Sequence, residues 1–418
     1  MSKPVTVLIV GAGSRGSIYA DWMDKVCVPA KVVGVAEPRA ERRELLARQH
    51  GLAAENVFDR WDAPLERAGK IADAVIITTP DHLHVEPACA YAERGYHMIL
   101  EKPMAPTAEG CRQVAAAVRK AGVMSCIGHV LRYAPYTRKL IEVLRAGAIG
   151  QVLDVQHLEP VGYWHQAHSF VRGNWGNQSR SSFMLLSKSC HDLDWLAYVV
   201  GSHPRRVSSF GTLSHFKADN APAGSAQRCL DCPADVEAAC PYSAKRVYFA
   251  MLERGVKGWP LDVLTTDLTP AGLERALRET PYGQCAYRCD NDVVDHQVVN
   301  IEFDGAQTGV FTMTAFSRAN MFRQTRIFGT RGEIFTDGKR VEVYDFVTEK
   351  VTTYEVAGLE GSQQHAGGDQ ALLEAFLGAV ANNDPARIVT DAEETLATHL
   401  AVFAAEQARL EGRVVEIE

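Results

Sequence analysis

The chain has 418 residues, of which 46% are hydrophobic, 23% charged and 8% aromatic. This is an ordinary globular composition, which excludes disordered, collagen-like and fibrous proteins, and the length favours two domains. The net charge of −7 has no long run of like charges behind it, which argues against nucleic acid or an anionic membrane surface as a partner. No signal-peptide pattern and no apolar run of ~20 residues is seen, so we expect a cytoplasmic protein.

The first third of the chain predicts the alternating strands and helices of a parallel sheet. Residues 5–10 form a continuous apolar run, as in a strand that is buried on both faces. The glycine-rich turn that follows has three glycines, Gly11, Gly13 and Gly16, and leads into apolar residues at helical spacing. A second strand, residues 31–36, ends at Glu37. This order and the position of the acid are typical of a dinucleotide-binding unit.

Each residue type in this unit has a physical role. Gly11 permits the tight turn, Gly13 lets the backbone approach a pyrophosphate, and Gly16 lets the helix pack close to the strand. The helix begins near Ser14 and Arg15, and its free N–H groups attract phosphate. The Glu37 carboxylate accepts hydrogen bonds from ribose hydroxyls and repels a 2′-phosphate, so we predict NAD rather than NADP.

Further strands at residues 74–78, 97–100 and 123–127 complete the sheet. Because open α/β sheets bind ligands outside the carboxyl ends of their strands, the residues that follow two of these strands are expected to border one crevice. The predicted cofactor-binding residues are Gly11, Gly13, Ser14, Arg15, Gly16, Glu37, Thr79, Pro80, His84, Glu101, Lys102 and Pro103.

The Glu101-Lys102-Pro103 motif in such a fold resembles the glucose-fructose oxidoreductase / inositol dehydrogenase / rhizopine catabolism (Gfo/Idh/MocA) family. Three further motifs support the resemblance over nearly the whole chain: Thr79-Pro80-Asp81-x-x-His84, His191-Asp192-Leu193-Asp194 and Gly329-Thr330-Arg331-Gly332-Glu333. The resemblance implies an α/β fold class, with an NAD-binding Rossmann domain over residues 1–129 and an α+β domain over residues 130–418.

In that family the second domain holds a large, mostly antiparallel open sheet that binds substrate and supports oligomerisation, so a homodimer or homotetramer is expected. The residue pattern independently predicts strands of this sheet. They cover residues 152–158, 206–211, 297–303, 308–314, 323–328 and 340–346.

The resemblance makes Lys102 and His191 the expected catalytic residues, with Pro103 in cis beside the nicotinamide. Removing hydride from a secondary alcohol also releases the hydroxyl proton, which needs a base and a cation near the alkoxide. The ordinary pKa of a histidine suits such a base. Family members commonly carry an aspartate four residues before this histidine, but the chain has Ser187 there. The proton route therefore stays open between Lys188, Asp192 and a tyrosine, and Lys188 is also a candidate for binding an anionic substrate group.

Aromatic and polar residues alternate upstream, between residues 163 and 175. Aromatic rings stack on the apolar face of a sugar and polar tips bind its hydroxyls, although the same composition also suits a packed loop under the sheet. The predicted substrate-binding residues are Tyr163, His165, His168, Arg172, Trp175, Lys188 and Asp192.

An insertion at about residues 214–294 concentrates half of the ten cysteines: Cys229, Cys232, Cys240, Cys285 and Cys289. The Cys-x-x-Cys pair followed by further cysteines favours a structural zinc site with either Cys285 or Cys289 as the fourth ligand. An iron–sulfur cluster and a set of free thiols are the alternatives. Because the segment shows little apolar material, we expect the metal to organise it.

Three functions follow from these observations. The first is an NAD-dependent dehydrogenase that oxidises a secondary hydroxyl of a sugar, sugar derivative or cyclitol. The second is an NAD-dependent glycoside hydrolase that acts by transient C3 oxidation, elimination, water addition and re-reduction. The third is a cofactor-bound regulator without activity, against which the retention of Lys102 and His191 argues.

Overall fold

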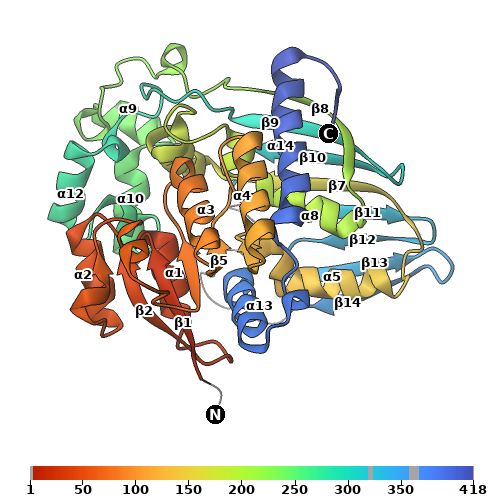
Figure 1. The fold of residues 1–418 in the computed structure, drawn as a ribbon. Helices are drawn as coiled ribbons and strands as arrows, with labels where there is room; N and C mark the ends of the chain where they lie inside the picture. The colour runs from red at the N-terminus through yellow and green to blue at the C-terminus, as the bar shows by residue number, and fades with distance from the viewer. Residues whose placement is uncertain (1–2, 319–322, 357–366, 418) are drawn as a thin grey trace.

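The computed structural model describes residues 3–318, 323–356 and 367–417, and it contains two sheets (Figure 1). The first sheet has six parallel strands in the order β3-β2-β1-β4-β5-β6, which is the doubly wound order of a Rossmann domain. Its strands are β1 (Val5–Val10), β2 (Ala30–Ala36), β3 (Val57–Phe58), β4 (Ala74–Ile77), β5 (His97–Leu100) and β6 (Ser125–Ile127).

The first sheet is buried on both faces, which explains its continuous apolar strands. On one face Val7 and Ile9 belong to one hydrophobic cluster, and on the other face Leu8 and Val10 belong to a second. The connecting helices contribute to both clusters: α1 (Ser14–Trp22), α2 (Ala40–Gln49), α3 (Val85–Glu93) and α4 (Ala108–Ala121). The predicted parallel sheet is confirmed, although strand β3 and helix α2 were not predicted from the sequence.

The second sheet has nine strands in the order β14-β13-β12-β11-β7-β10-β9-β8-β15. Only β7 and β10 pair in parallel, and the remaining ladders are antiparallel. The strands are β7 (Val152–Pro160), β8 (Pro204–Thr212), β9 (His296–Phe303), β10 (Thr308–Thr314), β11 (Gln324–Gly329), β12 (Gly332–Thr336), β13 (Arg340–Asp345), β14 (Lys350–Glu355) and β15 (Val415–Glu416). The predicted α/β fold with a large, mostly antiparallel sheet is confirmed.

One face of this second sheet carries helices and the main core. Leu140 of α5 (Pro135–Arg145), Trp195 of α8 (Cys190–Val200) and Ala405 of α14 (Ala392–Glu411) are buried in the same cluster as Val155 and Phe311 of the strands. Figure 1 shows these three helices lying across the sheet. The N-terminus of α8 thereby lies at the end of the sheet that meets the Rossmann domain.

The chain returns to the Rossmann domain near its end. Helix α13 (Gly368–Asn382) buries Leu372, Phe376 and Leu377 in the cluster that contains Val7 and Ile9 of β1. Residues 130–418, expected as a separate domain, therefore contribute to the packing of the first sheet, through α13 on one face and through the start of α14 on the other. The division at residue 129 stays a prediction.

The cysteine-rich insertion folds around a small core of its own. Its helices are α9 (Ala234–Ala239), α10 (Ala244–Glu253), α11 (Leu261–Leu264) and α12 (Pro270–Glu279). Tyr248, Leu261, Leu273 and Leu277 are buried together between them. The expectation that this segment has little apolar material was wrong, because its apolar residues are spread over short helices rather than gathered in one run.

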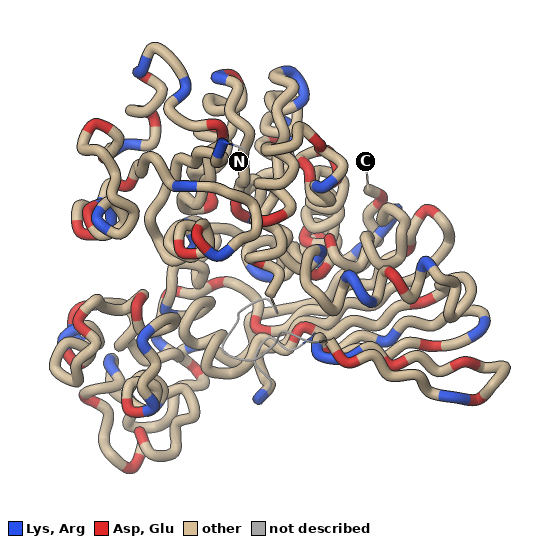
Figure 2. The backbone as a smooth tube through the Cα atoms, turned by 90° about the horizontal axis from the view of Figure 1, so that it is seen from below, with Lys and Arg blue, Asp and Glu red and all other residues tan. Residues whose placement is uncertain are grey.

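Acidic and basic residues are interspersed over the described part of the chain (Figure 2). None of the described helices combines the length and the apolar character needed to cross a membrane.

Candidate active site

The glycine-rich turn leaves no room for side chains at two of its positions. Gly11 has φ +96°, and a Cβ there would lie 2.7 Å from the Thr78 carbonyl oxygen. A Cβ on Gly16 would lie 1.9 Å from the Gly11 carbonyl oxygen. Gly13 is different, because only the Arg39 guanidinium lies within 4 Å of its Cβ position. The turn thus packs tightly at Gly11 and Gly16 and leaves the Gly13 backbone open, as a pyrophosphate cradle requires.

Glu37 is buried at the end of β2, beside this turn. Its carboxylate accepts hydrogen bonds from the Ala12 N–H at 2.8 Å and from the Arg39 guanidinium at 2.7 Å. Burial alone would raise the pKa of Glu37, but the hydrogen bonds from Arg39 and Ala12 bring it below its ordinary value. The group is therefore an anion at the position where the adenosine ribose of a dinucleotide lies.

Arg15 links the first helix to the Glu101-Lys102-Pro103 motif. Its guanidinium donates to Glu101 at 2.8 Å and to Asp369 of α13 at 2.6 Å, and Tyr19 donates to the same Glu101 oxygen at 2.7 Å. Burial alone would raise the pKa of Glu101, but the charge of Arg15 keeps it lowered. The Arg15 Nη1 atom is buried and has no hydrogen-bond partner among the described residues.

His84 joins the two segments expected to flank the cofactor. Its buried ring lies between the Thr79 carbonyl oxygen, 2.9 Å from Nε2, and the Pro103 carbonyl oxygen, 2.7 Å from Nδ1. The Lys102–Pro103 peptide bond is cis, as the resemblance implies. Thr79, Pro80, Glu101 and Pro103 therefore border one region at the carboxyl ends of β4 and β5.

Lys102 reaches from the Rossmann domain to the segment that carries His191. Its ammonium group donates to the Ser187 carbonyl oxygen at 2.6 Å. Ser187 ends the short helix α7 (Met184–Ser187), and His191 lies in the first turn of α8. The backbone of Ser187 thus receives the lysine at the position where family members have an aspartate side chain. The two predicted catalytic residues belong to adjoining segments of the site.

A group of buried histidines lies behind His191. The His129 ring is 5.5 Å from that of His191 and 5.3 Å from that of His399, and burial lowers the pKa of His129 to about 4. The side-chain ligand atoms of His129, Cys190 and His399 lie within 4.8 Å of one another. His399 uses one ring nitrogen for the Met104 N–H and the other for the Thr395 carbonyl oxygen. The ring nitrogens of His399 are thus engaged, whereas both ring nitrogens of His129 lack a hydrogen-bond partner among the described residues.

Lys188 and Asp192, predicted to bind substrate, belong to a buried ion network. Lys188 lies 3.1 Å from Glu159, and Asp192 accepts hydrogen bonds from Arg323 at 2.5 Å and from His157 at 3.0 Å. Burial lowers the pKa of Lys188, and Glu159 offsets this only in part. Burial alone would raise the pKa of Asp192, but Arg323 holds it well below its ordinary value. The contacts of Asp192 are those of a structural ion pair.

Three members of this network were not predicted as site residues: His157, Glu159 and Arg323. A signal for the first two was present in the sequence, because Val155, His157 and Glu159 alternate along the buried face of β7. Polar side chains on the apolar face of a strand are costly to bury unless they have partners. Arg323 precedes β11 and carries no comparable signal.

The aromatic segment, residues 163–175, divides between the surface and the insertion. Tyr163 and Trp175 are each 37% exposed. His165, His168 and Arg172 are buried against the insertion. The His165 ring is 4.9 Å from that of Trp259, the His168 Nδ1 atom is 2.8 Å from the Tyr248 hydroxyl, and Arg172 donates to the Tyr242 carbonyl oxygen. The packed-loop alternative describes these three residues, and the sugar-binding role predicted for them finds no support in their contacts.

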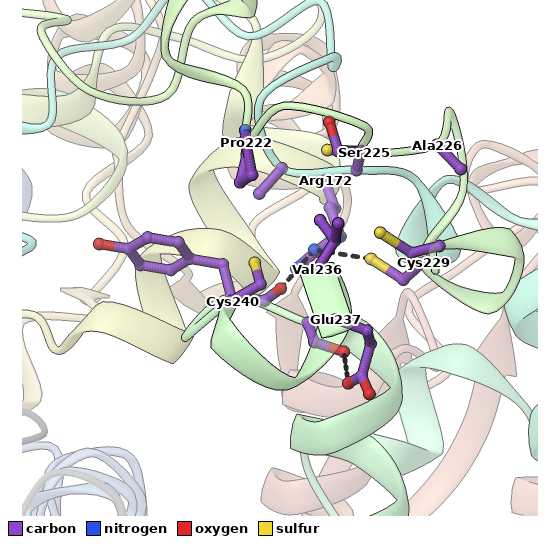
Figure 3. A pocket seen from close by; sticks show the side chains of 13 residues that line it. Arg172, Pro222, Ser225, Ala226, Cys229, Val236, Glu237 and Cys240 are labelled. Carbon is purple, nitrogen blue, oxygen red and sulfur yellow. Dashed lines mark hydrogen bonds between the residues drawn. The ribbon is translucent and has the colours of Figure 1, made fainter. Parts of the chain in front are cut away.

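All ten cysteines are free thiols. Within the insertion Cys229, Cys232, Cys240 and Cys285 line one pocket, and Cys289 lies outside it, with its sulfur 3.3 Å from the Cys285 carbonyl oxygen (Figure 3).

Family models match both parts of the chain. An oxidoreductase-family NAD-binding Rossmann fold matches residues 5–129, and the oxidoreductase-family C-terminal alpha/beta domain matches residues 141–417. The chain belongs to the Gfo/Idh/MocA oxidoreductase family. The glycine cradle and Glu37 of this structure suit the NAD that the Rossmann domain of the family binds.

Relatives in the Gfo/Idh/MocA family include enzymes with different printed activities. The chain is 31% identical over 211 residues to a 2,7-anhydro-N-acetylneuraminate hydratase of Escherichia coli. This match covers 50% of this chain and 53% of the relative. It is 28% identical over 209 residues to an inositol 2-dehydrogenase of Streptomyces avermitilis, 50% of this chain and 57% of that enzyme. It thus spans about half the length of these relatives. The oxidoreductase YteT of Bacillus subtilis is 28% identical over 80% of this chain and 77% of its own length.

Solved structures share the whole fold. A levoglucosan dehydrogenase in complex with NADH and levoglucosan superposes with a TM-score of 0.72 at 18% identity, covering 99% of this chain and 100% of that one. An oxidoreductase of Agrobacterium radiobacter in complex with NAD+, L-tartaric acid and magnesium gives a TM-score of 0.71 at 14% identity, covering 99% and 98%. At these identities the likeness concerns the fold alone.

Proposed function

We propose that this protein is an NAD-dependent dehydrogenase that oxidises a secondary hydroxyl of a sugar, sugar derivative or cyclitol. The observation that carries the proposal is the hydrogen bond from Lys102 to the Ser187 backbone, because it joins the cofactor side of the site to the segment of His191. When bound, NAD+ accepts the hydride of the oxidised carbon. Inositol and levoglucosan dehydrogenases among the similar proteins support this substrate class.

The residues of the chain would handle the charge and the proton. The Lys102 ammonium group stabilises the developing alkoxide, and the Ser187 carbonyl oxygen orients it. His191 accepts the hydroxyl proton, as the intrinsic basicity of an imidazole allows near neutral pH. The exposed rings of Tyr163 and Trp175 are available to stack on a sugar. Lys188 is already paired with Glu159, so we assign it to shaping the site rather than to the base.

The test is a reduction assay with purified full-length protein, NAD+ and a panel of levoglucosan, myo-inositol, scyllo-inositol and 2,7-anhydro-N-acetylneuraminate. We expect absorbance at 340 nm to rise with turnover for at least one member. The Lys102→Met variant should bind NAD+ normally and lose this signal. Turnover by Lys102→Met at the wild-type rate would contradict the proposed role of this lysine.

A second candidate is an NAD-dependent glycoside hydrolase or hydratase that uses transient C3 oxidation, elimination, water addition and re-reduction. It is favoured by the 31% identity to a 2,7-anhydro-N-acetylneuraminate hydratase and by Ser187 at the family's aspartate position. This activity would consume the anhydro sugar without net change at 340 nm. Solvent deuterium would also enter the product at the carbon next to the oxidised one, whereas a simple dehydrogenase would leave that carbon unlabelled.

The remaining assignments are part of the same proposal. We place the protein in the cytoplasm, where cysteines stay reduced and none of the ten forms a disulfide. We also expect a homodimer or homotetramer. The zinc expected in the insertion has a structural role, because a coordination sphere closed by cysteines leaves no position for substrate.

A further inference from the structure

The insertion contains a pocket whose lining is rich in sulfur. Cys229 and Cys232 come from the Cys-x-x-Cys motif at the turn before α9, Cys240 follows α9, and Cys285 lies after α12. The four residues are 56 positions apart at most in sequence, yet they line the same cavity (Figure 3). Cysteines brought together in this way from three separate segments are the usual framework of a thiolate metal site.

The size of the pocket limits what it can hold. Its volume is about 20 Å³, which is room for one water-sized guest. A sugar or a nucleotide does not fit in this space. A single ion bound by the surrounding sulfurs fits.

The lining of the pocket favours Cys285 over Cys289 as the fourth ligand. Cys285 lines the pocket, whereas the Cys289 sulfur lies 3.3 Å from the Cys285 carbonyl oxygen and is outside the lining. Among the described residues, no three sulfur atoms of this set lie within 4.8 Å of one another. Tetrahedral zinc–sulfur bonds of ~2.3 Å place the sulfurs about 4 Å apart, so ion binding has to turn the cysteine side chains inward.

Arg172 connects this pocket to the candidate active site. Its guanidinium reaches between Cys229 and Cys240, 3.6 Å from the Cys229 sulfur, and it donates to the Tyr242 and Gln284 carbonyl oxygens at 2.6 and 2.7 Å (Figure 3). Four thiolates around a divalent cation carry a net charge of −2, and a buried arginine offsets part of that charge. Arg172 ends the segment that begins at Tyr163, directly after the strand that carries Glu159.

We propose that Cys229, Cys232, Cys240 and Cys285 bind one structural zinc ion, and that Arg172 couples this centre to residues 163–172. The ion fixes the insertion against the wall of the substrate cleft. The zinc site is independent of the proposed function. The effect of the zinc site on substrate binding rests on the proposed function.

The metal content of purified full-length protein tests the site without an activity assay. We expect about one zinc per chain for the wild type and for Cys289→Ser, and less than about 0.2 for Cys232→Ser and Cys285→Ser. Protein without metal, protein with iron and sulfide, or loss of zinc from Cys289→Ser but not from Cys285→Ser would overturn the assignment. Should Cys232→Ser fail to fold, cobalt substitution of the wild type decides, because four thiolates give intense sulfur-to-cobalt absorption and fewer thiolates give less.

Arg172→Met tests the coupling, with Arg288→Met as the control because Arg288 is exposed in the same insertion. We expect Arg172→Met to keep its zinc, to melt at a lower temperature and to raise the KM for the sugar at least ~10-fold with unchanged NAD+ affinity. An Arg172→Met protein that melts and turns over like Arg288→Met would contradict the coupling and leave the zinc site in place.

Discussion

Glu37 is the residue that sets the choice between the two nicotinamide cofactors. Its carboxylate is buried, whereas the Arg39 side chain that it holds is more than half exposed. Replacing Glu37 removes the anion that repels a 2′-phosphate and releases an arginine that can bind one.

We therefore expect Glu37→Ser to improve NADP+ affinity relative to NAD+ by about tenfold or more, measured as the two dissociation constants by calorimetry. Glu41→Ser, which changes an exposed acid nearby, is the control. An unchanged preference in Glu37→Ser would mean that this acid does not select the cofactor.

Asp192 is the anion of the buried network, and its role is stability. Removing one partner of a buried ion pair leaves the other charge uncompensated, at a cost of about 3–5 kcal/mol. We expect Asp192→Asn to lower the free energy of unfolding by about 3 kcal/mol, because Arg323 keeps Glu159 as a second partner. Urea unfolding measures the loss, and Asp219→Asn on the surface is the control.

The Asp192 carboxylate should also make the free energy of unfolding depend on pH. Its pKa in the folded protein lies below that in the unfolded chain, so the stabilisation is fully present above about pH 4 and is lost as the pH falls toward the folded value. The free energy of unfolding should thus fall less steeply between pH 4 and 2 in Asp192→Asn than in the wild type. Equal slopes would show that Asp192 contributes nothing to acid unfolding.

Site residues that belong to local sequence motifs could be predicted, whereas site residues defined by tertiary contacts could not. The glycine turn, Glu37 and Lys102 could be predicted because strand, turn and acid follow one another within a short stretch. The pairing of Arg323 with Asp192 joins residues 131 positions apart, and no local pattern encodes it. Arg172 was predicted to meet sugar because its neighbours are aromatic, but the sequence gives no indication of the backbone carbonyls that it binds.

At the level of elements, helix α14 is the one whose stability is easiest to test. The Asp391 carboxylate caps it, accepting from the N–H groups of Glu393 and Glu394 at 2.9 Å each. The helix packs on α8 and buries Ala401 and Ala405.

We expect Asp391→Ala to cost ~1 kcal/mol of unfolding free energy, and Asp391→Ser to retain most of the stability, because serine can also cap. Chemical denaturation of the two variants measures the difference. An alanine variant as stable as the serine variant would contradict the role of the cap.

Two of the elements missed from the sequence have identifiable physical causes. Strand β14 is exposed along its whole length, so it has no alternation of polar and apolar residues to predict it. Helix α13 is rich in buried residues almost all round, which blurs the helical period. Strand β10, which has one buried face, was predicted with its observed bounds.

For the whole molecule, the open face of the large sheet is where we expect a second copy to bind. A groove of about 430 Å³ runs over its outer strands, and its lining includes Phe335, Tyr344 and Val351. Val351 is 61% exposed, and Phe346 and Val347 in the turn before it are 50% and 71% exposed, so exposed apolar side chains gather here.

Light scattering coupled to size-exclusion chromatography should give the mass of a dimer or tetramer for the wild type. Val351→Asp should shift the protein toward lower mass, and Leu45→Asp, an exposed change on α2, should not. A monomeric wild type would refute the oligomer, and an unchanged mass in Val351→Asp would refute this face as its interface.

The two-sheet arrangement matters because it brings the end of β5 to the segment before α8. Lys102 follows β5 and His191 lies in the first turn of α8, and the proposed chemistry requires both at one substrate hydroxyl.

Single-turnover mixing of protein and NAD+ with a substrate from the panel, deuterated at the oxidised carbon, is the most direct measurement. We expect deuterium to transfer to the cofactor in the wild type, and transfer at least ~10² slower in Lys102→Met and His191→Asn at unchanged NAD+ affinity. Transfer at the wild-type rate in either variant would contradict the joint action of these two residues.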